Sequence, residues 1–213
     1  MTPRRDVCST ASNRPALRTG VFGGTFNPLH LGHLLVADDV RRRCRLDRVL
    51  FLAGARPPHK PARNLAPWPH RRRMLRLGLA GRPEFELTDV EEKLPGPGYT
   101  VHALEALRAE RPKDSLYLIL GADQYREMSG WHEPARLTRR ARLIVMSRPG
   151  TGRPKLFRGH AAARVRFLPV IEVDLAGSDI RARLASGRSV RYMLPTPVHR
   201  YIRRHRLYVR QDS

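Results

Sequence analysis

Residues 20–34, GVFGGTFNPLHLGHL, decide the fold of this 213-residue chain. The stretch begins in a short apolar run, passes through Gly23, Gly24 and the turn dipeptide Asn27-Pro28, and continues with apolar residues at helical spacing. This order indicates a strand, a glycine-rich turn and a helix. Glycines let other atoms approach the backbone, and a helix N-terminus presents unpaired N–H groups and the positive end of its dipole. The stretch therefore predicts a phosphate site.

Two histidines, His30 and His33, lie at or just inside the first turn of the predicted helix. A spacing of three places their side chains on nearly the same face, so both imidazoles can contact one polyphosphate. The stretch lacks the Lys-Ser/Thr pair of a Walker loop and does not fit G-x-G-x-x-G. The alternative interpretation is a pair of structural histidines at a helix start.

Further apolar runs predict strands that alternate with helical segments. The clearest strand, residues 115–120 (SLYLIL), is apolar nearly throughout, as expected for a strand buried on both faces of a parallel sheet. The other strands are expected at 48–53, 85–88, 141–147 and within 164–173, and the helices at 70–80, 101–109 and from 196 onward. Such alternation predicts an α/β fold, a doubly wound and mostly parallel sheet in three layers.

Polar residues follow the clearest strand directly. Gly121 and Asp123 lie just past its carboxyl end, which is where open α/β sheets bind ligands. We expect Asp123 to accept hydrogen bonds from a ribose or an amide.

Residues 175–181 (LAGSDIR) predict a second phosphate site. Ser178 is placed to cap a helix whose first turn holds Arg181, and Gly187 is placed to end that helix. A hydroxyl, backbone N–H groups and a guanidinium would then converge, as a triphosphate requires. The hypothesis requires this turn to meet His30 and His33 in one cleft.

The string GGTFNPLHLGH, residues 23–33, resembles the H-x-G-H signature of the nucleotidylyltransferase superfamily. More narrowly, it looks like the bacterial nicotinate-mononucleotide adenylyltransferases, because the related phosphopantetheine adenylyltransferases usually carry Thr in place of His30. The resemblance extends from about residue 17 to residue 208. It implies a Rossmann-like nucleotidylyltransferase fold and adenylyl transfer from ATP to nicotinate mononucleotide, giving deamido-NAD and pyrophosphate in NAD biosynthesis.

The resemblance also implies roles for residues outside the first motif. Lys60 lies in a P-P-H-K segment that leans over the phosphates in similar enzymes. Thr100 is placed to cap the predicted helix at 101–109. Tyr99 and Thr100 also match a turn whose N–H groups receive the carboxylate of the pyridine ring. Trp131 matches a tryptophan that stacks on that ring, although core packing is an alternative, and Arg148 matches an R-P-G segment at the nucleotide pocket.

The family pattern I-S-S-T/S-x-I-R is only partly present at 175–181, because Ala176 and Gly177 replace its two earlier serines. The predicted catalytic residues are His30, His33, Lys60 and Arg181. The residues predicted to bind ATP are Gly23, Gly24, Thr25, Phe26, His30, His33, Gly121, Asp123, Arg148, Ser178 and Arg181. Those predicted to bind nicotinate mononucleotide are Thr25, Asn27, Lys60, Tyr99, Thr100, Val101, Trp131 and His132, and no metal ligand is predicted among the protein side chains.

In this reaction the phosphate of the mononucleotide is itself the nucleophile, so catalysis is expected to depend on positioning and charge stabilisation. His30 and His33 would donate hydrogen bonds to the α- and β-phosphates. Lys60 and Arg181 would add positive charge, and Ser178 would hold the leaving pyrophosphate. Mg²⁺ is expected to arrive with ATP, held mostly by phosphate oxygens and water.

The formal charge of +22 is extreme and comes almost wholly from arginine. Such a surface binds polyanions without specificity, which supports a basic nucleic-acid-binding protein as an alternative. The arginines are scattered along the chain and no aromatic-rich nucleic-acid motif accompanies them, so no specific nucleic-acid partner is expected. A closer alternative is the same chemistry on nicotinamide mononucleotide or phosphopantetheine.

Residues 1–15 are predicted to be a disordered tail without the apolar core of a secretory signal, and residues 16–213 a single domain. No apolar run approaches the ~20 residues of a membrane span, so no membrane partner is expected. Cys8 and Cys44 lie far apart and form no metal pattern. They favour a reducing compartment, and a cytoplasmic location is expected. A homo-oligomer is compatible with the sequence.

Overall fold

The structure, a computed structural model, describes residues 15–54, 65–147, 154–155 and 164–209, and every structural statement below refers to these ranges. The predicted disordered tail, Lys60 and Arg148 lie outside the described residues. The division into a tail and one domain over 16–213 therefore stays a prediction.

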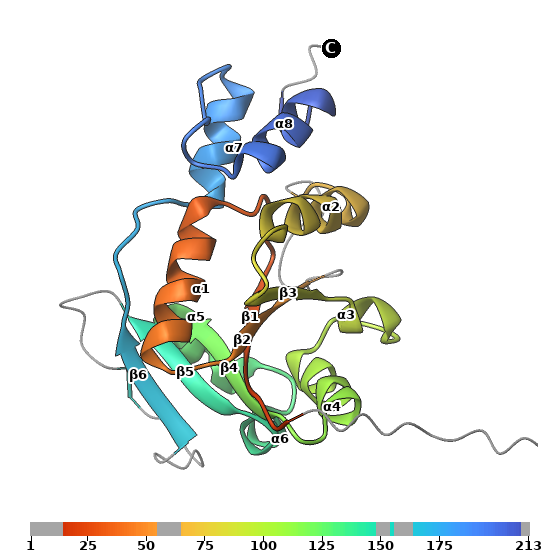
Figure 1. The fold of residues 1–213 in the computed structure, drawn as a ribbon, viewed down its shortest axis with the longest axis vertical. Coiled ribbons are helices and arrows are strands. Elements are labelled where there is room, and N and C mark those ends of the chain that lie inside the picture. Colours follow the sequence, from red (N-terminus) through yellow and green to blue (C-terminus); the bar gives the residue numbers. More distant parts are fainter. Residues whose placement is uncertain (1–14, 55–64, 148–153, 156–163, 210–213) are drawn as a thin grey trace, which may run out of the picture.

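Six strands form one parallel sheet in the order β3-β2-β1-β4-β5-β6 (Figure 1). Because the order reverses between β1 and β4, the carboxyl ends of these two strands form the switch point at which doubly wound sheets bind ligands. The predicted doubly wound fold is confirmed. The strands are β1 (Arg18–Gly24), β2 (Arg48–Ala53), β3 (Phe85–Thr88), β4 (Ser115–Gly121), β5 (Arg142–Ser147) and β6 (Val165–Pro169).

Helices cover both faces of the sheet and make it the middle of three layers. They are α1 (Leu31–Arg43), α2 (Trp68–Leu79), α3 (Val90–Lys93), α4 (Thr100–Glu110), α5 (Ala122–Glu127), the 3₁₀ turn η2 (Met128–Gly130), α6 (Pro134–Arg140), α7 (Gly177–Ala185) and α8 (Thr196–Arg204). Side chains of α1 and α2 form one apolar core with the sheet, and those of α4, α5 and α6 form a second core on the opposite face. Each fully buried aliphatic side chain in these cores contributes about 1.5–3 kcal/mol.

A third apolar cluster joins α2, α7 and α8, which lie together beyond the carboxyl end of the sheet (Figure 1). Met74, Ile180 and Val198 are fully buried within it. Gly78 of α2 permits this packing, because a Cβ there would lie 2.4 Å from Cδ2 of Leu29 and 3.2 Å from Cγ2 of Val198. The cluster thus brings the C-terminal helices close to the loop between β1 and α1.

Two helix caps differ from the prediction. The sequence places Thr100 and Ser178 at N-caps, whereas the caps are Tyr99 for α4 and Ala176 for α7. The predicted and observed starts of α4 and α7 agree to within two residues. Tyr99 and Ala176 have extended backbones, and neither makes a side-chain capping bond. The first N–H groups of both helices are therefore not satisfied by a side-chain cap.

The end of the last strand also differs, because β6 stops at Pro169 rather than continuing toward residue 173. The N–H of Val170 still donates a 3.1 Å hydrogen bond to the carbonyl oxygen of Ser147, the last residue of β5, so β6 ends where its partner strand ends. The predicted end of α7 is confirmed, since Gly187 follows the helix with φ of 69°. No helix in the described part of the chain is both long and apolar enough to cross a bilayer.

Candidate active site

The two predicted phosphate turns meet in one cleft of about 370 Å³, called here the phosphate cleft. Nη1 of Arg181, the fifth residue of α7, donates a 2.8 Å hydrogen bond to the carbonyl oxygen of Asn27 in the β1–α1 loop. The prediction that His30, His33 and Arg181 share a cleft is confirmed. The residues that line it are Thr25, Phe26, Asn27, Pro28, His30, His33, Leu65, Gly177, Ser178 and Arg181.

The two histidines stack at the start of α1, with ring centroids 3.6 Å apart and planes inclined by 24°. Nδ1 of His33 accepts a 3.2 Å hydrogen bond from the backbone N–H of His30. A neutral His33 therefore carries its proton on Nε2, which makes Nε2 a donor.

His30 is almost completely buried, with 6% of its surface exposed. Burial disfavours the charged ring and lowers the pKa of His30 from 6.5 to about 4, so it is neutral at pH 7. Its Nδ1 is buried without a hydrogen-bond partner among the described residues. A buried polar atom without a partner costs free energy, so we expect this nitrogen to hydrogen-bond to a ligand or a water molecule.

Gly177 accounts for one of the two departures from the family pattern. A Cβ at this position would lie 3.1 Å from the carbonyl oxygen of Asn27 and 3.4 Å from Nη1 of Arg181. A serine side chain at position 177 would crowd the carbonyl oxygen of Asn27 and the guanidinium of Arg181, whose hydrogen bond connects the two turns of the cleft. Glycine loses a hydroxyl but allows α7 to approach the β1–α1 loop closely.

Asn27 connects three segments of the chain. Its Oδ1 accepts hydrogen bonds from the backbone N–H of Ala66 at 3.0 Å and from the hydroxyl of Tyr208 at 2.7 Å. Its carbonyl oxygen accepts the bond from Arg181. These contacts make Asn27 a residue that positions the phosphate cleft, and its predicted contact with a mononucleotide stays a prediction.

Arg71 supports the same loop and was not singled out from the sequence. It is 1% exposed, and burial lowers the pKa of its guanidinium. Its Nε donates to the carbonyl oxygen of Ala66 at 3.0 Å, and its Nη1 donates to those of Thr25 at 3.1 Å and Gly54 at 2.7 Å. The signal in the sequence is an arginine three and four residues before Met74 and Leu75, on the buried face of α2.

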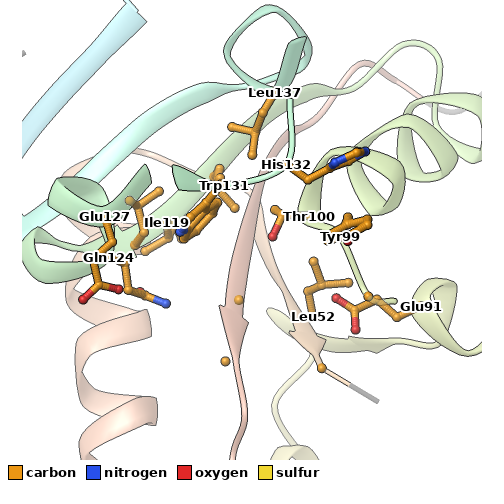
Figure 2. Close-up of a pocket in the computed structure, with 16 residues that line it drawn as sticks. Leu52, Glu91, Tyr99, Thr100, Ile119, Gln124, Glu127, Trp131, His132 and Leu137 are labelled. Carbon is orange, nitrogen blue, oxygen red and sulfur yellow. The ribbon is translucent and has the colours of Figure 1, made fainter. Parts of the chain in front are cut away.

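A second cavity of about 480 Å³, the aromatic cavity, opens at the carboxyl ends of β1, β2 and β4 (Figure 2). The structure brings six predicted residues together around it, namely Gly23, Gly24, Tyr99, Thr100, Trp131 and His132. Trp131 is half-buried against the second core and also lines the cavity, so its stacking on a pyridine ring stays a prediction. Val101 is fully buried in that core and does not line the cavity.

Three polar side chains of the aromatic cavity were not among the predicted site residues: Glu91, Gln124 and Glu127 (Figure 2). Oε1 of Gln124 accepts a 3.1 Å hydrogen bond from the backbone N–H of Gly121. Glu91 and Gln124 lie just past the carboxyl ends of β3 and β4. Their position just past these strands is the feature of the sequence that could have indicated a ligand site.

A third cavity of about 500 Å³, the outer cavity, lies beyond the ends of β4 and β5. It includes the predicted residues Gly121 and Asp123, together with Arg126. The carboxylate of Asp123 is exposed and pairs with the guanidinium of Arg126. The predicted Arg148 follows Ser147, the last residue of β5 and a lining residue of this cavity, but lies outside the described residues.

A parallel 3-2-1-4-5-6 sheet with paired histidines and an arginine at its switch point is the arrangement of a nucleotidyltransferase. Residues 21–183 match the family model described as cytidylyltransferase-like, and the chain belongs to this family. Within it, the chain belongs with the nicotinate-nucleotide adenylyltransferases, as its relatives indicate.

Two of these relatives carry the name "Probable nicotinate-nucleotide adenylyltransferase". The one from Thermomicrobium roseum is 44% identical, over 90% of this chain and 91% of its own. The one from Syntrophotalea carbinolica is 38% identical, over 92% of this chain and 99% of its own. A solved structure of Plasmodium falciparum nicotinic acid mononucleotide adenylyltransferase complexed with NaAD has the same fold, with a TM-score of 0.72, 17% identity and coverage of 90% and 97%.

Proposed function

We propose that this chain transfers the adenylyl group of ATP to nicotinate mononucleotide, giving deamido-NAD and pyrophosphate in NAD biosynthesis. The observation that carries the proposal is the phosphate cleft, in which His30, His33 and Arg181 converge. The aromatic cavity begins at Gly24, next to Thr25 of the phosphate cleft. Two substrates bound in these hollows would therefore bring their phosphates to one loop. The names of the curated relatives support the same reaction.

Each substrate has a compartment of suitable chemistry. The triphosphate of ATP would occupy the phosphate cleft, with Arg181 and the uncapped N-terminus of α7 as its partners. The adenosine would extend toward Gly121 and Asp123 of the outer cavity. The pyridine ring would stack on Trp131, and its carboxylate would meet the uncapped N-terminus of α4.

The reaction needs no covalent intermediate with the protein. An oxygen of the mononucleotide 5′-phosphate forms a bond to the α-phosphorus of ATP as the bond from that phosphorus to the α–β bridging oxygen breaks. Negative charge grows on the leaving pyrophosphate, where Arg181 and the Nε2–H of His33 would stabilise it. Because His30 is neutral, its ring can line the cleft without the free-energy cost of burying a charge.

Mg²⁺ would enter with ATP as part of the substrate. Among the described residues that line the phosphate cleft there is no carboxylate, so the protein offers the ion no direct acidic ligand there. This lining fits an ion held by phosphate oxygens and water, which suits the reluctance of Mg²⁺ to dehydrate.

Several predictions from the sequence remain open. Lys60 and Arg148 are still expected to contact phosphate and nucleotide, respectively. The cytoplasmic location, a homo-oligomer and the lack of a specific nucleic-acid partner also remain predictions.

The test is pyrophosphate release from ATP with nicotinate mononucleotide, nicotinamide mononucleotide and phosphopantetheine compared side by side. We expect the highest kcat/KM with the first. His33→Ala should lower turnover by more than ~10²-fold, the scale for losing one donor to a developing charge. His205→Ala, an exposed histidine after α8, serves as the control. Near-normal turnover in His33→Ala would reject the catalytic role of His33. A higher kcat/KM with another acceptor would reject nicotinate mononucleotide as the substrate.

A further inference from the structure

We propose that His102, His132 and Glu133 form a binding site for Zn²⁺ or a similar late first-row divalent ion at the rim of the aromatic cavity. His102 lies in α4, and the other two residues directly precede α6. One ligand atom from each side chain lies within 4.8 Å of the other two. Two imidazoles and one carboxylate suit these ions, and three protein ligands leave one tetrahedral position for water or an anion.

The separation of the two imidazole rings fits a shared ion. The ring centroids of His102 and His132 are 5.4 Å apart, and the planes are inclined by 75°. Zinc bound at about 2.0–2.1 Å to one nitrogen of each ring, with a tetrahedral angle, places two such centroids about 5 Å apart. The observed and required separations of the centroids differ by only a few tenths of an ångström, so the spacing of the rings is compatible with one ion between them.

The carboxylate is also close to a ligating position. Nε2 of His132 lies 3.6 Å from Oε2 of Glu133. Neighbouring ligand atoms around a tetrahedral zinc ion lie about 3.3–3.4 Å apart. The same carboxylate accepts a 2.9 Å bond from Nη1 of Arg136, which holds it in place.

Neighbouring side chains orient the imidazoles before any ion binds. Tyr99 stacks on the ring of His132, with centroids 4.2 Å apart and planes inclined by 19° (Figure 2). His102 meets Tyr99 edge to face at 5.8 Å. Ordered ligands lose less side-chain freedom on binding, which favours a site that is already assembled.

Two guanidinium groups of α6 are paired with carboxylates, even though the whole chain carries +22. Glu105 accepts two 2.8 Å hydrogen bonds from Arg136 and a 3.0 Å bond from Arg140. With Glu133, the two carboxylates offset the two guanidinium groups. Their positive charge therefore opposes a bound cation less than that of two unpaired guanidinium groups would.

Such an ion would tie the start of α4 to the segment that carries Trp131. Tyr99 caps α4 and lines the aromatic cavity, and His132 follows Trp131 on another part of its wall (Figure 2). The ion would hold these two walls at a fixed separation. The site stands on its own ligand geometry and does not depend on the proposed reaction.

The test is a Co²⁺ and Zn²⁺ titration of the full chain without an affinity tag. Tetrahedral Co²⁺ gives visible absorption bands, and Zn²⁺ should displace it at one equivalent. His102→Ala and His132→Ala should each lower the Zn²⁺ affinity by at least about 100-fold, because even outer partners of metal ligands are worth 10–100-fold. Glu133→Gln keeps the size of the side chain and should lower the affinity at least about 10-fold, with an unchanged thermal melt.

The chain supplies a matched control in His70 and His205. Their rings are also 5.4 Å apart, inclined by 59°, but no carboxylate joins them into a three-ligand group in the described part of the chain. His205→Ala should therefore leave the Zn²⁺ affinity unchanged. Absence of stoichiometric binding to the wild-type chain, or binding that survives both His102→Ala and His132→Ala, would overturn the proposal.

Discussion

Replacing His30 by glutamine should make the folded protein less sensitive to acid. Burial lowers the pKa of His30 from 6.5 to about 4, so the folded state resists protonation that the unfolded state accepts. Between these pH values the unfolded chain binds more protons, and the free energy of unfolding falls as the pH falls. The loss begins near pH 6.5 and is complete near pH 4.

The size of the effect follows from the two pKa values. At 1.36 kcal/mol per pH unit, the complete loss corresponds to about 3 kcal/mol. Between pH 7.5 and pH 5, linkage gives about 2 kcal/mol, because His30 is still largely neutral in the folded state at pH 5. Glutamine does not titrate, so His30→Gln removes this contribution.

Urea unfolding at pH 7.5 and pH 5 of both proteins measures the difference. Carboxylates such as Asp89, whose pKa is lowered by its hydrogen bond from Arg72, also cost stability in acid, but both proteins contain them. Their effect cancels when the two pH dependences are subtracted. His205→Gln controls for the same exchange at an exposed position. Parallel pH dependences for the wild type and His30→Gln would refute the reasoning, since the buried ring would then carry no penalty.

Three further substitutions test the site and its supports. Trp131→Ala should raise the KM for nicotinate mononucleotide about 10-fold through lost stacking and buried area, while the KM for ATP stays unchanged; steady-state kinetics that show the reverse would contradict the placement of the ring. Tyr208→Phe removes the 2.7 Å bond to Asn27 and should cost about 1 kcal/mol in urea unfolding, so an unchanged midpoint would argue against that contact. Arg71→Met deprives three carbonyl oxygens of their donor and should cost more than about 3 kcal/mol. Arg72→Met loses only partly exposed ion pairs, with Asp89 and Glu92, and should cost about 1 kcal/mol or less.

The fold and the phosphate cleft were predictable because their signals are local. The apolar run of β4 and the alternation of strands and helices determine a parallel sheet without knowledge of distant contacts. The glycines before α1 and the position of His30 and His33 place a polyanion site at a helix start. The contact between Arg181 and that turn was predicted on chemical grounds. Two basic turns that each suit a triphosphate are expected to bind the same one, and so to lie close together.

The supports of the cleft were not predictable, because they depend on contacts between distant segments. The guanidinium of Arg71 donates to the carbonyl oxygen of Thr25, which lies 46 residues earlier in the chain. No local sequence pattern predicts that contact. The caps at Tyr99 and Ala176 were missed because capping preferences favour hydroxyl-bearing residues, whereas tertiary packing sets where the extended backbone ends.

The bond between Asn27 and Tyr208 has a consequence for how the enzyme is made. The two residues are 181 positions apart, so at about 5–20 residues per second a ribosome delivers Tyr208 roughly 10–40 s after Asn27. All six strands emerge before that moment. A nascent chain can therefore assemble its sheet while Asn27 of the β1–α1 loop still lacks one of its hydrogen-bond partners, and the loop gains its full set of contacts only after Tyr208 has been added.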